Sequence, residues 1–223
     1  MSGLDLAANL SNSFEYAKKL FSDFGRLVIL IVLNLIPIVD WIVLGYASRV
    51  LKESPGADAP PKLEDYGELF VDGAKIFFAS LIYMIIPLIL IAVGVGGLVA
   101  GMFMGGGVAP MLLLGGTGLV LLLIGIVVAF LMLIVLAAGV AHMIKTGKFG
   151  KAFAFGEIFR VIAKVGWGKY LVWVVFVAVI AIIVGGVCGS IPYVGWLIMA
   201  IIGPALLVFF FRSLGILYSE GAP

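Results

Sequence analysis

Apolar residues run without a charged side chain through two long parts of this chain. Residues 76–144 and 170–211 contain no Asp, Glu, Lys or Arg. A helix that crosses a bilayer needs about 20 apolar residues, so each stretch is long enough for two crossings. The pattern predicts spans over residues 76–98, 119–142, 168–189 and 195–217. A glycine-rich turn separates the first two spans, and a short turn at residues 190–194 separates the last two.

Three further segments place apolar and charged residues on different faces of a helix. In residues 10–24 the residues on the apolar face are Leu10, Phe14, Ala17, Phe21 and Phe24. Residues 63–74 and 149–164 repeat this pattern, with aromatic residues on one face and charges on another. Helices of this kind lie in the headgroup plane with the apolar face towards the membrane. We therefore expect three amphipathic interfacial helices.

Residues 27–51 are apolar enough for a fifth span, but Pro37 interrupts them. Proline removes a backbone hydrogen bond and clashes with the preceding helical turn. Two short helices in a re-entrant hairpin therefore fit as well as one kinked span. If the segment re-enters, all 14 Lys and Arg residues share one side of the membrane. A full span would leave Lys18, Lys19 and Arg26 on the opposite side from the rest.

Positive charge marks the cytoplasmic side, so the charge pattern favours the re-entrant hairpin. We predict an all-α integral membrane protein in the cell membrane, with residues 1–223 as one membrane domain. It has four transmembrane helices, a re-entrant N-terminal hairpin and three interfacial helices, with both termini cytoplasmic. Five transmembrane helices remain the alternative.

A short internal similarity supports the hairpin. Residues 36–41 read Ile-Pro-Ile-Val-Asp-Trp, and residues 191–196 read Ile-Pro-Tyr-Val-Gly-Trp. Each follows an amphipathic segment and an apolar one, and the apolar segment before Pro37 is about half as long as the one before Pro192. We interpret the two regions as one supersecondary unit used twice, although chance similarity is frequent in apolar sequence.

Composition agrees with a membrane protein and excludes several functional classes. The chain has 223 residues, of which 64% are hydrophobic and 12% are charged. Soluble domains carry about 25% charged residues. The net charge of +2 is too small to indicate nucleic acid, and one cysteine, Cys188, allows no intrachain disulfide and no multi-cysteine metal site. We expect no cofactor, and we expect the single histidine, His142, to be an interfacial residue at the end of a span.

Asp40 is the one charged residue deep within an apolar stretch. Acids within a membrane are candidates for ion or proton handling. Asp40 also follows Pro37 by three residues, where a carboxylate can cap the second short helix. We expect capping and keep the ion or proton role as the alternative. Asn34 is expected to bind the terminal carbonyls of the first short helix, which makes Asn34 and Asp40 the candidate intramembrane polar site.

A second group of candidates consists of residues positioned to contact lipid headgroups. Lysine and arginine stems cross apolar surface while their charges reach the phosphates, and basic clusters attract anionic lipid. The candidate headgroup contacts are Tyr46, Arg49, Lys148, Lys151, Arg160 and Lys164. Small residues such as Gly97 and Gly101, and Gly185, Gly186 and Gly189, allow close helix packing and could support a homo-oligomer.

Part of the sequence resembles a known family. Residues 67–73, Gly-Glu-Leu-Phe-Val-Asp-Gly, followed by Leu-Ile-Tyr at 81–83 and Pro87, are similar to the DUF4013 family, as is Gly-Tyr at 45–46 with Arg49. The resemblance extends from about residue 14 onward and is clearest over residues 34–87. It departs at Leu63 and Tyr66, where family members are expected to carry tryptophan. It implies a small multi-pass membrane protein, largely archaeal, without assigned activity or catalytic residues.

The functional expectation is therefore coarse. We expect a non-enzymatic protein that binds lipid, organises the membrane or acts as a scaffold, with membrane lipids as its main partners and no nucleic acid. The alternative is a small transporter or channel that uses the broken helix around Pro37 and Asp40. An enzyme has the least support, because no paired acids, Ser-His arrangement or metal-ligand cluster lies within the predicted spans.

Overall fold

The computed structural model of the protein describes residues 5–103 and 107–222, and it contains helices and no strand in these residues. The connection after α4 contains residues 104–106, which lie outside the described residues, so the predicted turn is described only in part. The helices are α1 (Leu6–Lys18), η1 (Lys19–Ser22), α2 (Phe24–Asn34), α3 (Trp41–Glu53), α4 (Tyr66–Phe103), α5 (Val108–Pro110), η2 (Met111–Gly115), α6 (Gly116–Thr146), η3 (Phe149–Phe153), α7 (Phe155–Val165), α8 (Trp167–Gly189) and α9 (Gly195–Gly221).

Within the described residues, four helices are long and apolar enough to cross a membrane. They are Tyr66–Phe103, Met111–Thr146, Trp167–Gly189 and Gly195–Gly221. The four predicted spans lie inside these helices. The chain is therefore an all-α membrane protein.

The first long helix differs from the prediction. Residues 63–74 and 76–98 were expected to form an interfacial helix and a separate span, but α4 continues through both for 38 residues. Lys75 lies inside the helix, and its ammonium pairs with Asp72 one turn earlier at 2.8 Å. Pro87 also lies inside α4. Membrane helices tolerate an internal proline when neighbouring groups replace the lost hydrogen bond.

The chain forms two compact units, and each is described by itself. One unit consists of residues 78–136, that is, the distal part of α4, α5, η2 and most of α6. Its helices approach closely through glycines. A Cβ added at Gly97 would lie 2.9 Å from the Cα of Gly118, and one at Gly101 would lie 2.6 Å from the backbone nitrogen of Gly115. Gly97 and Gly101 therefore have the packing role expected of small residues in membrane helices.

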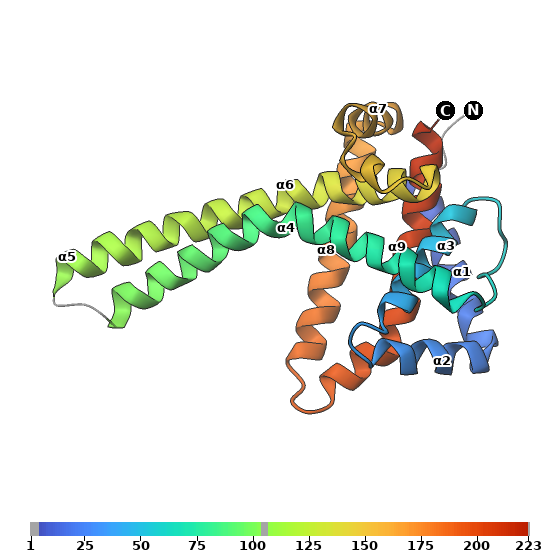
Figure 1. Cartoon of the computed structure of the whole chain (residues 1–223), viewed down its shortest axis with the longest axis horizontal. Helices are drawn as coiled ribbons and strands as arrows, with labels where there is room; N and C mark the ends of the chain where they lie inside the picture. The colour runs from blue at the N-terminus through green and yellow to red at the C-terminus, as the bar shows by residue number, and fades with distance from the viewer. Residues whose placement is uncertain (1–4, 104–106, 223) are drawn as a thin grey trace. The chain divides into compact units, whose positions relative to one another are not determined.

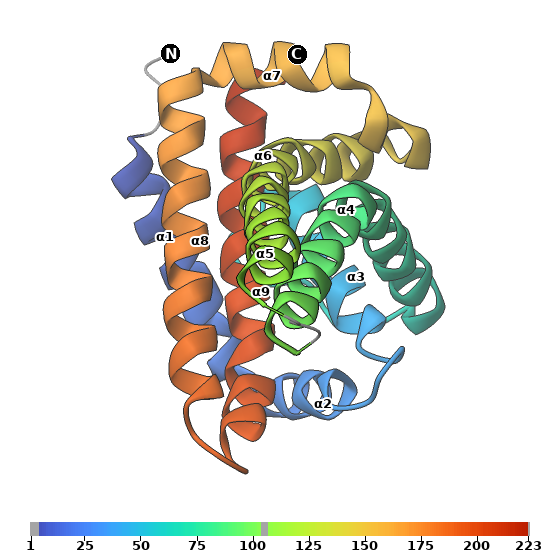
Figure 2. The same ribbon diagram turned by 90° about the vertical axis from the view of Figure 1, so that its left-hand side faces the viewer.

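The other unit consists of residues 1–77 and 137–223 and is built around α9. The helices α8 and α9 form an antiparallel hairpin, and α7 lies across the end of this hairpin opposite its connecting turn (Figure 2). The helix α1 runs antiparallel to α9 (Figure 2), with the Asn9 side chain donating to the Ser213 carbonyl and Leu20 in the same buried cluster as Val208. The helix α3 runs parallel to α9, with Val43 in the same buried cluster as Val208 and its last turn against Gly215.

The packing of α1 differs from an interfacial helix lying flat in the headgroup plane. Its buried face consists of Asn9, Ser13, Tyr16 and Ala17, continued by Leu20 of η1. The aromatic residues of the predicted membrane face, Phe14, Phe21 and Phe24, are exposed. The chain therefore descends along α9 through α1, crosses beside it through α2 and returns along it through α3 (Figures 1 and 2).

The break at Pro37 divides residues 27–51 into two short helices. The helix α2 has 11 residues and α3 has 13. At 1.5 Å per residue each is about 16–20 Å long, shorter than the roughly 30 Å hydrocarbon core. No continuous helix crosses this region, so the residues that a fifth span requires are split between two helices.

The two Pro-containing turns have the same backbone structure. After α2, Leu35 N–H donates to the Val32 carbonyl and Asp40 N–H donates to the Ile36 carbonyl. After α8, the corresponding groups of Ser190 and Gly195 donate to Val187 and Ile191. The residue after each proline has a positive φ, 73° at Ile38 and 64° at Tyr193. The internal similarity in the sequence therefore corresponds to one turn that is used twice.

The left-handed backbone at Ile38 leads to a stability prediction. A β-branched residue in this region costs about 1–2 kcal/mol, which glycine avoids. We expect Ile38→Gly to raise the free energy of unfolding by about 0.5–1 kcal/mol, because the side chain is exposed and little packing is lost. Thermal unfolding in detergent measures the effect. Ile36→Gly, at an exposed position outside this region, should be destabilising, and the same sign for both variants would contradict the explanation.

Candidate functional site

The two residues predicted as an intramembrane polar site have separate roles. Asn34 donates from its side-chain nitrogen to the Ala200 carbonyl of α9 at 3.3 Å, not to the end of its own helix. Pro204 lies four residues after Ala200 and has no N–H to donate to that carbonyl. Asn34 thus replaces a hydrogen bond that the proline removes from α9.

Asp40 occupies the N-cap position of α3, but its side chain makes no capping hydrogen bond. Its backbone carbonyl accepts from Val43 and Leu44, while Oδ1 is buried and has no hydrogen-bond partner among the described residues. The expected capping role is therefore wrong. The helical backbone conformation of Asp40 (φ −56°, ψ −21°) differs from the extended one of a capping residue and accounts for this difference.

Two predicted headgroup contacts, Tyr46 and Arg49, instead bind the connection at residues 54–65. Tyr46 is 1% exposed, and its hydroxyl donates to the Pro61 carbonyl at 2.9 Å. Burial raises the pKa of Tyr46 to about 12, so it remains a neutral donor. Arg49 donates to the Glu64 carbonyl and pairs with Glu68 at 3.4 Å. The prediction is wrong for Tyr46, which is buried, and Arg49 is engaged by protein groups.

Other cations and one further tyrosine bind the same connection. The prolines at 55, 60 and 61 provide no N–H groups, so nearby carbonyls require donors from elsewhere. The donors and the residues whose carbonyls accept are Tyr16 to Ala59, Lys19 to Asp58, Arg26 to Pro60 and Pro61, Lys145 to Ser54, and Arg212 to Pro55. Many of the basic residues counted for the charge pattern thus stabilise this connection.

The remaining predicted headgroup contacts lie on η3, α7 and the residue before η3. Lys151 is engaged within the protein, because its ammonium lies 2.5 Å from Glu157 Oε1. Arg160 donates from Nε to the Gly156 carbonyl of its own helix. Lys148, Arg160 and Lys164 are exposed. Arg160 Nη1 and Nη2, and the Lys148 and Lys164 ammonium groups, make no other hydrogen bond or ion pair to the described residues.

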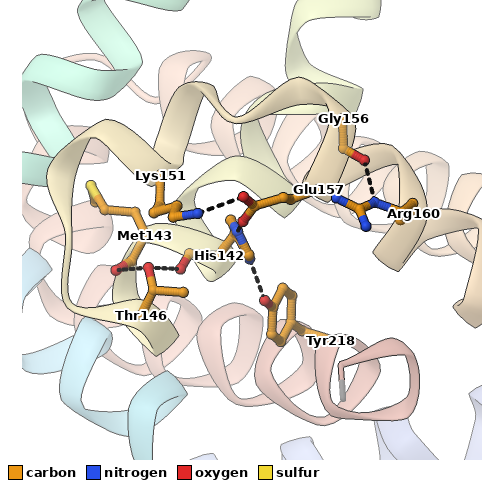
Figure 3. Close-up of polar contacts among 8 residues, drawn as sticks. All are labelled: His142, Met143, Thr146, Lys151, Gly156, Glu157, Arg160 and Tyr218. Carbon is orange, nitrogen blue, oxygen red and sulfur yellow. Dashed lines mark hydrogen bonds and ion pairs between the residues drawn. The ribbon is translucent and has the colours of Figure 1, made fainter.

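A polar cluster around His142 was missed by the sequence analysis (Figure 3). His142 Nδ1 lies 2.5 Å from the Tyr218 hydroxyl, and its Nε2 lies 2.7 Å from Glu157 Oε2. The cluster joins the end of α6, the first turn of α7 and the end of α9. His142 is 7% exposed and is therefore a buried residue that connects three helices.

The protonation pattern of this cluster follows from the Glu157 carboxylate. Hydrogen bonds from Lys151 and then from His142 lower the pKa of Glu157 from 4.5 to about 2. An ionised carboxylate only accepts hydrogen bonds, so Nε2 of His142 carries a proton. In the neutral ring Nδ1 then accepts from the Tyr218 hydroxyl. Both ring nitrogens are used within the protein, which leaves His142 without a free nitrogen to act as a base on a ligand.

The lowered pKa of Glu157 predicts how stability depends on pH. The folded pKa is below the unfolded one, so the stabilisation is complete above pH 4.5 and is lost as the pH falls towards 2. We expect Glu157→Gln to be less stable than wild type at pH 6, with the difference shrinking between pH 4.5 and 2. Thermal unfolding in detergent at several pH values measures this. Glu64→Gln, at an exposed carboxylate with no ion pair among the described residues, is the control, and an equal response there would contradict the assignment.

An apolar groove lies between α1, η1, α8 and α9. It has a volume of about 540 Å³ and is lined by Leu10, Phe14, Ala17, Lys18, Phe21, Phe176, Ile180, Ile202, Ala205, Leu206 and Phe209. Lys18 is the one charged residue of the lining, and its ammonium pairs with Glu15 at 2.9 Å. Phe14 and Phe21 are 57% and 53% exposed. The predicted membrane face of residues 10–24, apart from Phe24, thus forms one wall of a groove.

The site residues give no sign of a metal centre. Within the described residues, no group of three or more His, Cys, Asp or Glu side chains could hold a metal ion. Cys188 is a buried free thiol.

Residues 27–193 match the family model described as "Protein of unknown function (DUF4013)". No curated protein and no solved structure matches the chain.

Proposed function

Because the chain belongs to the DUF4013 family, whose function is unknown, we propose a function from its own structure: it binds a membrane lipid through the groove between α1, η1, α8 and α9. The observation that carries this proposal is the apolar lining of the groove. A ligand pocket usually has a volume of 300–1,000 Å³ and a mostly apolar wall, and the groove meets both conditions. The occupant that we propose is the acyl chain of a phospholipid.

The position of the groove supports an acyl chain over other apolar ligands. Phe176 and Ile180 lie in the middle of α8, and Ile202 and Ala205 lie in the first half of α9, two helices with the length and composition of membrane spans. A groove at this level along the helices faces the hydrocarbon of the bilayer, where acyl chains are the abundant apolar molecules. No water-soluble substrate is needed to explain it.

The proposal is tested by the lipid that stays with the purified protein. We expect Phe14→Ser to reduce the lipid retained after detergent exchange by about tenfold, since burial of a phenyl group contributes about 1.5 kcal/mol or more. Native mass spectrometry measures the bound lipid. Phe24→Ser is the matched control, because Phe24 is 74% exposed and lies outside the groove. Equal retention in both variants would rule out the groove as a lipid site.

The proposal also specifies how the protein is oriented in the membrane. We assign the end of the α8–α9 hairpin that carries α7 to the cytoplasmic side of the cell membrane, because the basic residues of α7 and of the segment before it gather there. The N-terminal helices then enter on this side through α1 and return to it through α3, with α2 at the far end (Figure 2). A cysteine at Lys148 in a Cys188→Ala background should react with an impermeant reagent only from the cytoplasmic side, and reaction from outside would contradict the orientation.

One observation favours a second function, a small transporter or channel. Oδ1 of Asp40 is buried without a hydrogen-bond partner among the described residues, and such groups cluster at ion and proton pathways in membrane helices. If the protein moves protons or cations, liposomes that contain it should show flux that Asp40→Asn abolishes. Unchanged flux in the variant would remove Asp40 from any such role.

A further inference from the structure

A pocket separate from the apolar groove lies beside the His142 cluster. It has a volume of about 400 Å³ and is lined by His142, Glu157, Arg160, Val161, Lys164 and Gly221. Its walls come from α7 and from the ends of α6 and α9. Gly221 allows α9 to reach α7, because an added Cβ would meet the Val161 carbonyl.

The charges around this pocket favour an anion. Arg160 and Lys164 lie one helical turn apart on α7, and both are exposed. Apart from the bond from Arg160 Nε to Gly156, neither cation has a hydrogen bond or ion pair to the described residues. The one carboxylate of the lining, Glu157, is already bound by Lys151 and His142. Two cationic groups are therefore available at the pocket without a protein anion to neutralise them.

We propose that this pocket binds a phosphate group, held by the Arg160 guanidinium and the Lys164 ammonium. The planar guanidinium offers two parallel N–H donors that match phosphate oxygens, and the ammonium adds a point charge. His142 and Glu157 position α7 relative to the ends of α6 and α9, so the two cations face the pocket together. His142 and Glu157 themselves do not contact the phosphate in this proposal. Their polar atoms are already bound to each other and to Lys151 and Tyr218.

The location of the pocket suits the phosphate of a lipid headgroup as well as a soluble phosphate. Trp167 begins α8 directly after α7, and its ring lies 6.0 Å from that of Phe159. Tryptophan at the end of a span marks the interface where lipid phosphates lie. Phe155 and Phe159 of α7 are exposed, as in a helix that borders the apolar layer.

Two measurements on the full chain in detergent test the proposal. The first follows the unfolding temperature during titration with inorganic phosphate against sodium chloride of equal ionic strength, since a ligand of the folded state stabilises it. The second uses native mass spectrometry to compare retained phosphatidic acid with phosphatidylcholine. The test variant is Arg160→Gln with Lys164→Gln. The control is Lys52→Gln with Lys62→Gln, which removes the same charge from exposed lysines outside the pocket.

We expect the test variant to weaken binding of inorganic phosphate or phosphatidic acid by at least about tenfold, as the loss of charge-assisted hydrogen bonds implies. The control variant should bind as wild type does. Stabilisation by inorganic phosphate alone assigns the pocket to soluble phosphate, and selective retention of phosphatidic acid alone assigns it to a lipid headgroup. An equal loss in both variants, or no binding of either probe by wild type, would overturn the proposal. Phe14→Ser should leave binding of inorganic phosphate unchanged, so a failure of the apolar groove remains distinguishable.

Discussion

Replacement of Gly45 by alanine should lower the free energy of unfolding by about 3 kcal/mol, at the upper end of the usual cost of overpacking. A Cβ at Gly45 of α3 would overlap the Leu69 carbonyl of α4, and one at Gly73 of α4 would overlap the Trp41 carbonyl. The groups in the way are backbone atoms, which cannot rotate aside as a side chain can. The two helices must therefore separate, and the stacking of Trp41 on Phe77 at 5.0 Å is lost.

Thermal and denaturant unfolding in detergent measure this change. Gly67→Ala is the matched control in α4, because no atom lies within 4 Å of an added Cβ there. Alanine favours a helix over glycine by about 1 kcal/mol, so the control should be neutral or stabilising. If Gly45→Ala and Gly67→Ala agree within about 0.5 kcal/mol, the close approach of α3 and α4 is not a source of stability.

Replacement of Arg212 by leucine should destabilise the fold by about 2–3 kcal/mol, since it removes several hydrogen bonds of a charged donor from a buried site. Arg212 is 3% exposed and donates to Ser54 Oγ, to the Pro55 carbonyl and to Asn12 Oδ1. Its guanidinium also lies 4.4 Å from the centre of the Tyr16 ring. One side chain of α9 thus holds α1 and the start of the connection at residues 54–65.

Arg212→Lys should not restore stability, because an ammonium cannot reach these separate acceptors in the fork geometry of a guanidinium. Limited proteolysis gives a second measurement, with faster cleavage within residues 54–65 expected in both variants. Lys62→Leu, at an exposed position of the same connection, is the control and should cleave as wild type does. Cleavage at the wild-type rate in Arg212→Leu would show that the connection is held without this residue.

The long helices were predictable because absence of charge over 20 or more residues has one main physical meaning. The break at Pro37 and the repeated turn were also predictable, because a proline and its neighbours determine the local backbone structure. Helix boundaries were harder to predict. The change from an amphipathic to an apolar pattern near residue 75 indicated two helices, but a change of pattern does not interrupt the backbone hydrogen bonds, and α4 continues through it.

The polar sites were not predictable in the same way, because they join residues distant in the sequence. Tyr46 and Arg49 looked like interfacial residues, and no local pattern shows that their partners lie in a proline-rich connection. His142 meets Tyr218 across 76 positions. The available signal was the concentration of prolines at 55, 60 and 61, which leaves backbone carbonyls in need of donors that the connection cannot supply.

The packing of α1 and α3 on α9 has a consequence for biogenesis. During synthesis the N-terminal helices leave the ribosome first, but α9 follows every helix that packs against it. Until then Asn12 and Ser54 lack Arg212, and Asn9 lacks the Ser213 carbonyl. The N-terminal third of the chain therefore completes its fold late, and a nascent chain arrested before α9 should expose the residues 54–65 connection to protease.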